Sequence, residues 1–437
     1  MWRTTGPLPV NAPRNTFFDS AAYSNYDNFM LHVKTPEETL EIIISNFGHL
    51  EMDGESVPLR LSLGRVLYED IIADEAVPDF NRSTVDGYAL MSSDTFGCSD
   101  SLPALLRRAG EVKMGSVPET DVRRGECVYV QTGGEIPAGA DAVVMIEYTE
   151  DYGDGMVGIL RPCSPGENII FIGDDVTPGR KLYHKGHLIK PHDIGALSAL
   201  GESVVKVCKR PIAGIISTGN ELIPFDERPA GGQIRDVNSN MLEAAAIAAG
   251  CEPLLMGIIP DEESALIAAL KEADECDLIL ISGGSSAGNK DVTLRVIEKL
   301  GRSLIHGIAM KPGKPTIVGE IEAKSSGKPV FGLPGHPVAA YFIFEVFVYP
   351  LICRWFGTSP ERRTLEASLD SQIPSNHGRA EFIAVKLEQG EEGLVAIPVI
   401  GKSGLITQMS GSDGYIAIPR DCEGLKQGSK VTVNLYS

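Results

Sequence analysis

From Pro211 to Gly284, apolar strand-like segments alternate with helical segments. The stretch PIAGIISTG reads as an apolar strand ending in small residues, and DLILISGG reads as a strand buried on both faces. Between them lie a helical segment (MLEAAAIAAG), a strand (PLLMGII) and a second helical segment (EESALIAALKEA). Strands that alternate with helices of this length predict a doubly wound, parallel α/β sheet. Such a sheet binds ligands at the carboxyl ends of its strands.

The rest of the chain has other patterns and predicts additional domains. Thr35 and Pro36, followed by two glutamates, offer an N-cap and a first turn for a helix. Residues of about 70 to 175 form short β-like runs, and the helical pattern after them resembles a return to the domain begun at Thr35. The predicted parts are an N-terminal extension (1–33), a discontinuous linker domain (34–69 and 176–206), an inserted β-rich domain (70–175), the α/β domain (207–357) and a C-terminal β domain (358–437).

Composition limits the classes of partner. A formal net charge of −20 over 437 residues argues against broad binding to nucleic acid or to an anionic membrane, although it leaves room for a local anion site. The longest apolar run, Ala339 to Cys353, is shorter than a membrane span and contains Glu345 and Pro350, so it predicts a buried helix. The N-terminus has no apolar core of signal-peptide type. Eight cysteines occur singly, which suits a reducing cytoplasm.

Three glycine-containing loops are predicted to leave strands of the α/β domain: Ser217–Glu221, Ser282–Gly288 and Lys311–Pro315. Glycine lets backbone N–H groups approach an oxyanion closely. In the third loop, a Pro-Gly-Lys-Pro turn restricts the backbone and aims Lys311 and Lys314 at one place. No Walker motif is present. One such loop is as often a tight turn as a ligand cradle, but three of them with a lysine pair favour a phosphate-binding site.

Four carboxylates lie close to these loops in sequence: Glu221, Asp236, Asp261 and Asp291. A phosphate beside carboxylates usually requires a divalent cation such as Mg²⁺. A helix cap is an equally good interpretation for each, because Asp261 and Asp291 both open helical segments.

For two other polar clusters, the residues alone favour a structural role over a ligand site. Asp86 lies in the string PDFNRSTVDGYA, where the residues alone favour an Asp-Gly turn. His184, His187 and His192 suit neither a tetrahedral zinc motif nor one helix face, so a surface or cap role is favoured.

Taken together, these strings resemble the molybdopterin molybdenumtransferase family, which comprises the bacterial MoeA-type enzymes and the homologous domain of gephyrin. The resemblance runs from about residue 34 to the end, in the family's order. The matching stretches are STVDGYA (83–89), QTGGEIPAGADAVVMIE (131–147), GENIIFIGDDVTPG (166–179), STGNEL (217–222), GQIRDVN (232–238), SGGSSAGNKDV (282–292), MKPGKP (310–315) and GLPGHPVAA (332–340).

The resemblance implies an elongated, four-domain homodimer with a barrel-like C-terminal domain and a linker domain that also serves dimerisation. It implies insertion of molybdate into adenylylated molybdopterin, release of AMP, a requirement for Mg²⁺, and a cytoplasmic location. It further implies an active site between the α/β domain of one subunit and the β-rich domain of the other, with substrate handed over by a molybdopterin adenylyltransferase. Whether tungstate replaces molybdate is left open.

The resemblance also implies roles for individual residues, and Lys311 and Lys314 are expected to hold the oxyanion. The active-site positions are Asp86, Thr132, Asp175, Glu221, Asp261, Asp291, Lys311 and Lys314. The substrate-binding positions are Ser217, Thr218, Gly219, Gly283, Gly284, Ser285, Pro312, Gly313, Pro315, Pro334 and Gly335. The Mg²⁺ ligands are Ser286, Asp291 and Glu221.

Several positions depart from the family pattern. Many members carry another lysine where this chain has Gly307. The common Gly-Asn-Pro-Val-Ser string is replaced here by Gly-His-Pro-Val-Ala, with His336 in place of Asn and Ala339 in place of Ser. A basic residue that often follows a Glu-Phe pair is replaced by Ile383-Ala384. These changes predict an altered anion site, with His306 or His336 supplying the missing donor.

Two other functions stay open. A pyrophosphatase acting on ADP-ribose-like substrates could use the same α/β domain, but it leaves the Asp86 region and the C-terminal domain unexplained. A non-enzymatic assembly scaffold is the second alternative, because the homologous domain of gephyrin also clusters receptors. The standalone molybdopterin adenylyltransferase lacks the flanking domains and is ranked low.

Overall fold

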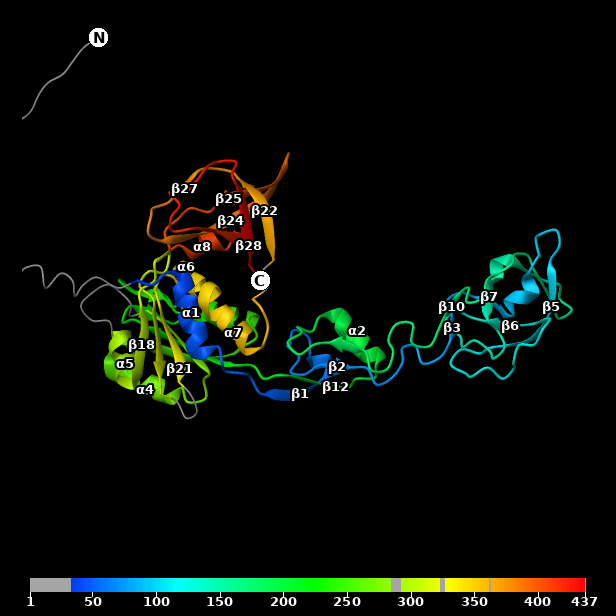
Figure 1. Cartoon of the computed structure of the whole chain (residues 1–437). Coiled ribbons are helices and arrows are strands. Elements are labelled where there is room, and N and C mark those ends of the chain that lie inside the picture. Colours follow the sequence, from blue (N-terminus) through cyan, green and yellow to red (C-terminus); the bar gives the residue numbers. More distant parts are fainter. Residues whose placement is uncertain (1–32, 284–291, 323–326, 361–362, 437) are drawn as a thin grey trace, which may run out of the picture. The chain divides into compact units, whose positions relative to one another are not determined.

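The computed structural model describes residues 33–283, 292–322, 327–360 and 363–436 (Figure 1). The chain divides into two compact units. The main unit contains the residues up to 50, 210–355 and those from 359 onward, and the insertion unit contains residues 51–209 and 356–358. The predicted extension lies outside the described residues, except for its last residue, Val33.

A six-stranded sheet forms the centre of the main unit, in the order β16-β13-β17-β21-β20-β18. Four strands are parallel: β13 (Ile212–Thr218), β16 (Glu252–Ile259), β17 (Leu278–Ser282) and β21 (Lys328–Leu333). The hairpin strands β20 (Ile317–Ile321) and β18 (Gly301–His306) add an antiparallel edge. The α/β sheet is therefore confirmed, and β17 is buried along its whole length as predicted.

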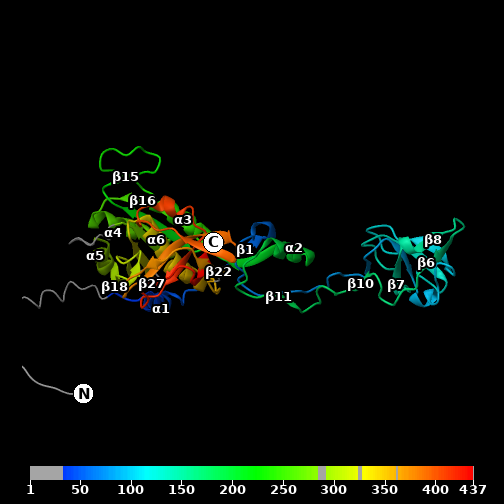
Figure 2. The same cartoon turned by 90° about the horizontal axis from the view of Figure 1, so that it is seen from above.

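Helices cover this sheet and connect its strands. They are α3 (Asn238–Ala248), α4 (Glu263–Glu272) and α5 (Val292–Leu300). Leu270 of α4 and Val296 of α5 pack with Ile281 and Val330 of the sheet in one buried cluster. Burial of each such side chain contributes about 1.5–3 kcal/mol relative to exposure. The segment between β13 and α3 contains the short strands β14 (Leu222–Ile223) and β15 (Ile234–Arg235). This segment extends away from the sheet (Figure 2).

Helix α1 (Pro36–Phe47) begins at the predicted cap. The side chain of Thr35 accepts a hydrogen bond from Glu38 N–H, and Glu38 accepts one from Thr35 N–H. Trp355, in α7 (Tyr349–Trp355), donates its indole N–H to the carbonyl oxygen of Phe47 at 2.8 Å. Figure 1 shows α1 beside α7 in the main unit.

The longest apolar run forms one continuous helical stretch. It consists of α6 (Pro337–Ile343), the π-helical turn η5 (Phe344–Val348) and α7. By length and hydropathy Pro337–Trp355 could cross a membrane, but 67% of its most apolar window is buried inside the protein. The prediction of a buried core helix is confirmed.

The C-terminal part of the main unit is a closed barrel. Its strands are β22 (Thr364–Leu369), β24 (Ala380–Gly390), β25 (Gly393–Pro398), β26 (Gly414–Ile418) and β28 (Lys430–Leu435). The order is β24-β25-β22-β28-β26, and β26 pairs again with β24 and closes the barrel. Small additions are the pair β23 (Ile373–Pro374) and β27 (Gly424–Leu425), and the helical turn α8 (Ile406–Met409). The barrel-like prediction is confirmed.

The lysine turn lies between β18 and β20, so it leaves a strand of the α/β domain as predicted, but that strand is at the antiparallel edge of the sheet. Lys311 belongs to β19 (Met310–Lys311), which pairs in parallel with β24 of the barrel and not with the α/β sheet. Only two of the three predicted loops therefore leave parallel strands of the sheet. The β19 pairing with the barrel was not predicted, and it reaches a strand about 70 residues further along the chain.

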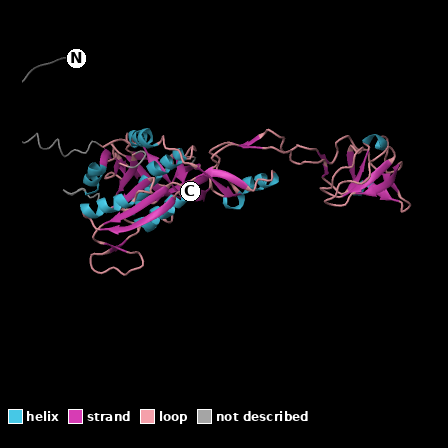
Figure 3. Ribbon diagram, turned by 90° about the horizontal axis from the view of Figure 1, so that it is seen from below, coloured by secondary structure: helices cyan, strands magenta, loops and turns pink. Residues whose placement is uncertain are grey.

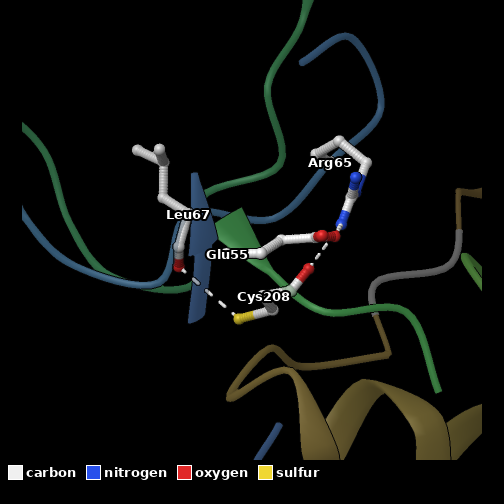
Figure 4. A network of polar contacts seen from close by, with 4 residues as sticks. All are labelled: Glu55, Arg65, Leu67 and Cys208. Carbon is white, nitrogen blue, oxygen red and sulfur yellow. Dashed lines mark hydrogen bonds and ion pairs between the residues drawn. The ribbon is translucent and has the colours of Figure 1, made fainter. Parts of the chain in front are cut away.

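In the insertion unit, two distant segments come together. Strand β1 (Gly54–Pro58) pairs with β12 (Val204–Cys208), and β2 (Ile71–Ile72) pairs with β11 (Lys181–Tyr183). Arg65 donates to the carbonyl oxygen of Cys208 at 2.7 Å and forms an ion pair with Glu55 (Figure 4). The Cys208 thiol faces the carbonyl oxygen of Leu67 at 3.9 Å (Figure 4). The turn η2 (Leu59–Leu61) and helix α2 (Pro191–Ala199) complete this part.

The residues between β2 and β11 form mostly strands and loops (Figure 3). Their sheet has the order β7-β4-β6-β5-β9-β8. Its strands are β4 (Gly87–Leu90), β5 (Ala104–Glu111), β6 (Glu126–Val130), β7 (Ala142–Met145), β8 (Thr149–Asp151) and β9 (Met156–Ile159). The pair β3 (Arg82–Ser83) and β10 (Ile169–Ile170) and the short turns η3 (Ser92–Thr95) and η4 (Ile146–Tyr148) lie outside it.

Candidate functional site

The lysine turn lines a cavity of about 730 Å³, here called the lysine pocket. Its walls come from residues 310–315, from 334–342 at the start of α6, and from barrel residues 373–409. Gly313 has φ +119°, and a Cβ there would lie 2.8 Å from Ile343 Cδ1, so glycine is required. Hydrogen bonds from Ile308 N–H to the Lys314 carbonyl oxygen and from the Thr316 hydroxyl to the Gly313 carbonyl oxygen hold the turn.

Four basic side chains line the lysine pocket: Lys311, Lys314, Arg379 and Lys402. Lys311 donates to Glu381 at 2.6 Å. The other three form no ion pair with any residue that the structure describes. A chain with a net charge of −20 therefore contains a local cationic cavity, which suits an anionic ligand.

A second cavity of about 540 Å³, here called the glycine pocket, lies at the carboxyl ends of β13 and β17. Thr218, Glu221, Gly283 and Gly335 line it. Gly283 has φ +104°, and a Cβ there would lie 2.1 Å from the carbonyl oxygen of Thr218. The close approach of the two loops therefore requires glycine at position 283. Ser217 is fully buried at the end of β13, behind this surface.

Asn238 connects two loops of the glycine pocket. Its side-chain amide donates to the Ser282 hydroxyl at 2.6 Å and to the Gly335 carbonyl oxygen at 2.9 Å. The side chain is only 6% exposed, and its Oδ1 has no hydrogen-bond partner among the described residues. A buried oxygen without a partner costs free energy, which a ligand donor in the pocket would offset.

His336 lines both cavities, and its Nδ1 lies 2.7 Å from the hydroxyl oxygen of Ser403. His306, the other histidine expected near the anion, lines neither cavity. Three of the positions that depart from the family pattern, Ala339, Ile383 and Ala384, line the lysine pocket. The changes expected at the anion site therefore concentrate in one cavity, with His336 at its border.

The residues expected to hold Mg²⁺ are described only in part. Glu221 is exposed, and both of its carboxylate oxygens lie close to Gly219. A Cβ added to that glycine would lie 2.9 Å from each oxygen. Asp261 is exposed as well, and its N–H donates to the side chain of Asn220 at 3.3 Å. Carboxylate oxygens of this kind fit a hard cation such as Mg²⁺. Gly284, Ser285, Ser286 and Asp291 lie outside the described residues, and within the described ones no group of three or more His, Cys, Asp or Glu side chains could hold a metal ion.

Asp86 and Thr132 come together in the insertion unit. The backbone N–H of Thr132 donates to Asp86 Oδ1 at 2.6 Å, and its hydroxyl donates to the same oxygen at 2.9 Å. These two hydrogen bonds hold the pKa of Asp86 below its ordinary value. Asp175 is exposed, and its carbonyl oxygen accepts from Arg180 at 2.6 Å. Asp86, Thr132 and Asp175 belong to the insertion unit, whereas the two pockets belong to the main unit.

The histidine run lies just before and at the start of α2, where His187 contacts a buried carboxylate and His184 and His192 are exposed. Asp193, near the start of α2, is 2% exposed, accepts from Lys190 N–H at 2.8 Å and lies 2.7 Å from His187 Nε2. Burial alone would raise the pKa of Asp193, but hydrogen bonds from His187, Lys190 and Tyr183 outweigh it and lower that pKa. Two causes raise the pKa of Tyr183 to about 12: its burial, which has the larger effect, and its hydrogen bond to Asp193.

Sequence reasoning missed Glu381, Arg379, Lys402 and Asn238. Glu381 precedes Phe382 in the Glu-Phe pair that drew attention to the following residues, but nothing local indicated its contact with Lys311. Arg379, directly before β24, and Lys402, in the loop between β25 and α8, are isolated basic residues that belong to no motif. Asn238 was the last residue of the matching stretch GQIRDVN, which was the one available signal.

Comparisons with known proteins cover nearly the whole described chain. Residues 34–201 match the MoeA N-terminal region (domain I and II), 214–354 a probable molybdopterin binding domain, and 366–436 the MoeA C-terminal region (domain IV). The molybdopterin molybdenumtransferase of Bacillus subtilis is 36% identical over 415 residues, which is 93% of this chain and 95% of the relative. The chain belongs to the MoeA family.

Other MoeA-family proteins agree with this placement. The molybdopterin molybdenumtransferase of Staphylococcus aureus (strain MRSA252) is 32% identical and covers 88% of this chain and 91% of its own. The crystal structure of the molybdopterin biosynthesis MoeA protein from Pyrococcus horikoshii OT3 superimposes with a TM-score of 0.81 at 36% identity. It covers 92% of this chain and all of the other. Membership in this family places the chain in molybdenum cofactor biosynthesis, and the comparisons give no support to the pyrophosphatase or scaffold alternatives.

Proposed function

We propose that this chain is a molybdopterin molybdenumtransferase that inserts molybdate into adenylylated molybdopterin and releases AMP. The observation that carries the proposal is the pair of adjoining cavities in the main unit, one cationic and one glycine-lined, which share His336. Two anionic reactants must be brought together in this reaction, and two neighbouring cavities of this chemistry suit that task.

The lysine pocket is the proposed oxyanion site. Lys311 and Lys314 hold the oxyanion, as expected from the sequence, and Arg379 compensates for the basic residue that is absent at Ile383-Ala384. His336 supplies a further donor at the border to the other cavity. Cations in a partly enclosed cavity interact with an anion more strongly than cations in bulk water, which offsets the repulsion from an acidic protein.

The glycine pocket is the proposed site for the phosphate end of the adenylylated substrate. Backbone groups around Gly283 and Gly335 can approach a phosphate closely, and Thr218 adds a hydroxyl. The other substrate contacts expected from the sequence are retained as part of the proposal: Ser217, Gly219, Gly284, Ser285, Pro312, Gly313, Pro315 and Pro334. Glu221, Ser286 and Asp291 are the proposed ligands of Mg²⁺. When bound, Mg²⁺ neutralises phosphate charge and makes AMP a better leaving group.

The remaining expectations are retained as proposals. The protein acts as a homodimer in which Asp86, Thr132 and Asp175 of one subunit complete the site of the other. This proposal is supported by Asp86, which is exposed and held by hydrogen bonds from Thr132 that lower its pKa. The four-domain division, a cytoplasmic location and delivery of the substrate by a molybdopterin adenylyltransferase belong to the same proposal. All eight cysteines lie in the described part of the chain and none forms a disulfide bond, which suits a reducing compartment.

The proposal is tested with the purified full chain, adenylylated molybdopterin and Mg²⁺. We expect AMP release that depends on added molybdate or tungstate. AMP release that is independent of any oxyanion, together with turnover of ADP-ribose, would instead support the pyrophosphatase alternative. The absence of oxyanion-dependent AMP release would refute the transferase proposal.

A further inference from the structure

The lysine pocket already contains an anion, the carboxylate of Glu381. Its Oε1 accepts from Lys311 Nζ at 2.6 Å, and its Oε2 accepts from the Ser375 hydroxyl at 2.9 Å. The Glu381 side chain is 12% exposed, whereas the Lys311 side chain is 58% exposed. Glu381 is therefore the fixed member of the pair, and Lys311 is the member that can turn toward a ligand.

Backbone pairing enforces this contact. Lys311 in β19 and Glu381 in β24 are register partners of a parallel strand pair. Register neighbours in adjacent strands project their side chains from the same face of a sheet. The Ala380 N–H also donates to the Ala309 carbonyl oxygen at 2.9 Å and extends the pairing by one residue. The strand pairing thus fixes the Glu381 carboxylate in the pocket, beside Lys311.

We infer that Glu381 is a built-in competitor of the oxyanion for Lys311 and thereby sets the oxyanion affinity of the pocket. The inference rests on the proposed function of the lysine pocket and adds the residue that tunes it. The ligand class is a tetrahedral dianion, such as molybdate or tungstate. Without ligand, the charge of Lys311 is neutralised by Glu381, and three other basic residues remain for the incoming anion.

The sign of the effect separates this role from a purely structural one. A lysine ammonium has three donors but only one charge, so it can bridge Glu381 and an oxyanion, while Glu381 repels the oxyanion at short range. If Glu381 served only to position Lys311, its neutralisation would weaken oxyanion binding or leave it unchanged. As a competitor, its neutralisation strengthens binding.

The decisive variant is Glu381→Gln, because glutamine keeps an oxygen that accepts from Lys311 and an amide that can donate to the Ser375 oxygen. The measurement is equilibrium dialysis of molybdate against the full chain without molybdopterin. We expect binding about tenfold tighter than in the wild type, and a steeper loss of that binding with added salt, because the net attraction to the anion is larger. In the Lys311→Ala background, the same substitution should produce a much smaller gain, since the competed cation is gone.

The matched control is Glu366→Gln, a barrel glutamate that accepts from the Thr432 hydroxyl at 2.6 Å and does not line the pocket. It should leave molybdate binding unchanged. Molybdate affinity of Glu381→Gln equal to or below that of the wild type, including no measurable binding by either protein, would overturn the inference. AMP release is assayed separately, so tighter binding without oxyanion-dependent AMP release would leave Glu381 as a competitor and refute the proposed reaction.

Discussion

The lysine turn and the Asp86 loop each present a charge proposed for the same reaction, but they hold it differently. Lys311 faces a carboxylate from a strand about 70 residues away, in a partly enclosed cavity of the main unit. The Asp86 carboxylate accepts hydrogen bonds from the neutral donors of Thr132, forms no ion pair with a residue that the structure describes, and is exposed in the insertion unit. The charge of Asp86 is therefore available without rearrangement, whereas Lys311 must exchange or share its partner.

The difference indicates two ways to prepare a charge for catalysis. Hydrogen bonds from neutral donors stabilise the ionised carboxylate and fix its direction, while its net charge is kept. An ion pair fixes the direction of the lysine but cancels its charge until a ligand arrives. Substitutions at the two places should consequently affect different kinetic parameters.

The largest effect is expected for Asp86→Asn, which retains an acceptor for Thr132 but removes the charge. If Asp86 acts in the chemical step, AMP release should fall about 10²- to 10⁴-fold, with little change in oxyanion binding. The measurement is AMP release at saturating molybdate. Asp154→Asn is the matched control, because this exposed aspartate also accepts a backbone N–H, from Met156 at 3.0 Å. Near-normal turnover by Asp86→Asn would remove Asp86 from the proposed site.

A somewhat smaller effect is expected for Lys314→Met in the lysine pocket. Lys314 forms no ion pair with a described residue, so its full charge is available to the oxyanion. The molybdate concentration for half-maximal AMP release should rise roughly 10- to 100-fold, whereas the rate at saturation changes little. Lys386→Met is the control, since Lys386 pairs with Glu388 at 2.8 Å on the barrel and does not line the pocket. An equal shift in both variants would indicate a general charge effect.

The elements of the α/β region could be predicted from the sequence because their periodicity is local. The strand in DLILISGG and the helix in EESALIAALKEA lie where the pattern placed them, as β17 and α4. The antiparallel edge formed by β20 and β18 was not predicted, because strand direction depends on partners that periodicity does not specify. The closure of the barrel through β26 and β24 was implied by the family resemblance and not by the β segments themselves.

The candidate site was predictable only in part, for the same reason. Glycine-containing loops and the lysine turn have local signatures, and they do line the two cavities. The contact between Lys311 and Glu381 depends on the pairing of β19 with β24, which no local pattern shows. Asp86 alone reads as a turn residue, and its interaction with Thr132 spans 46 positions. Long-range strand pairing is therefore what the sequence left undetermined.

A third expected effect concerns stability within the insertion unit. Asp193, like Asp86, is held by hydrogen-bond donors, but it is buried and structural. Its lowered folded-state pKa stabilises the fold above the unfolded pKa of about 4, and this stabilisation is lost as the pH falls through the folded pKa. Asp193→Asn should cost about 1–2 kcal/mol at pH 7 and less at pH 3.

The measurement is thermal unfolding of the full chain at both pH values. His192→Ala provides the control, because this ring is 76% exposed and lies 3.4 Å from Asp193. A penalty for Asp193→Asn that persists undiminished at pH 3 would show that packing, and not the carboxylate charge, carries the contribution of Asp193.

The smallest effect is expected for Thr132→Val, and it bears most directly on how Asp86 is prepared. The variant removes the hydroxyl donor but keeps the backbone N–H, so the ionised form of Asp86 loses one of its two stabilising hydrogen bonds. The pKa of Asp86 should rise toward its ordinary value. Because the rate falls as Asp86 is protonated, the acid limb of the kcat/KM profile should move to higher pH, with the plateau near neutral pH almost unchanged. Thr149→Val, which removes a hydroxyl that donates to the Ile146 carbonyl oxygen in the same unit, should leave the limb in place. If the acid limb does not move in Thr132→Val although Asp86→Asn is inactive, the backbone N–H of Thr132 alone is sufficient to lower the pKa of Asp86.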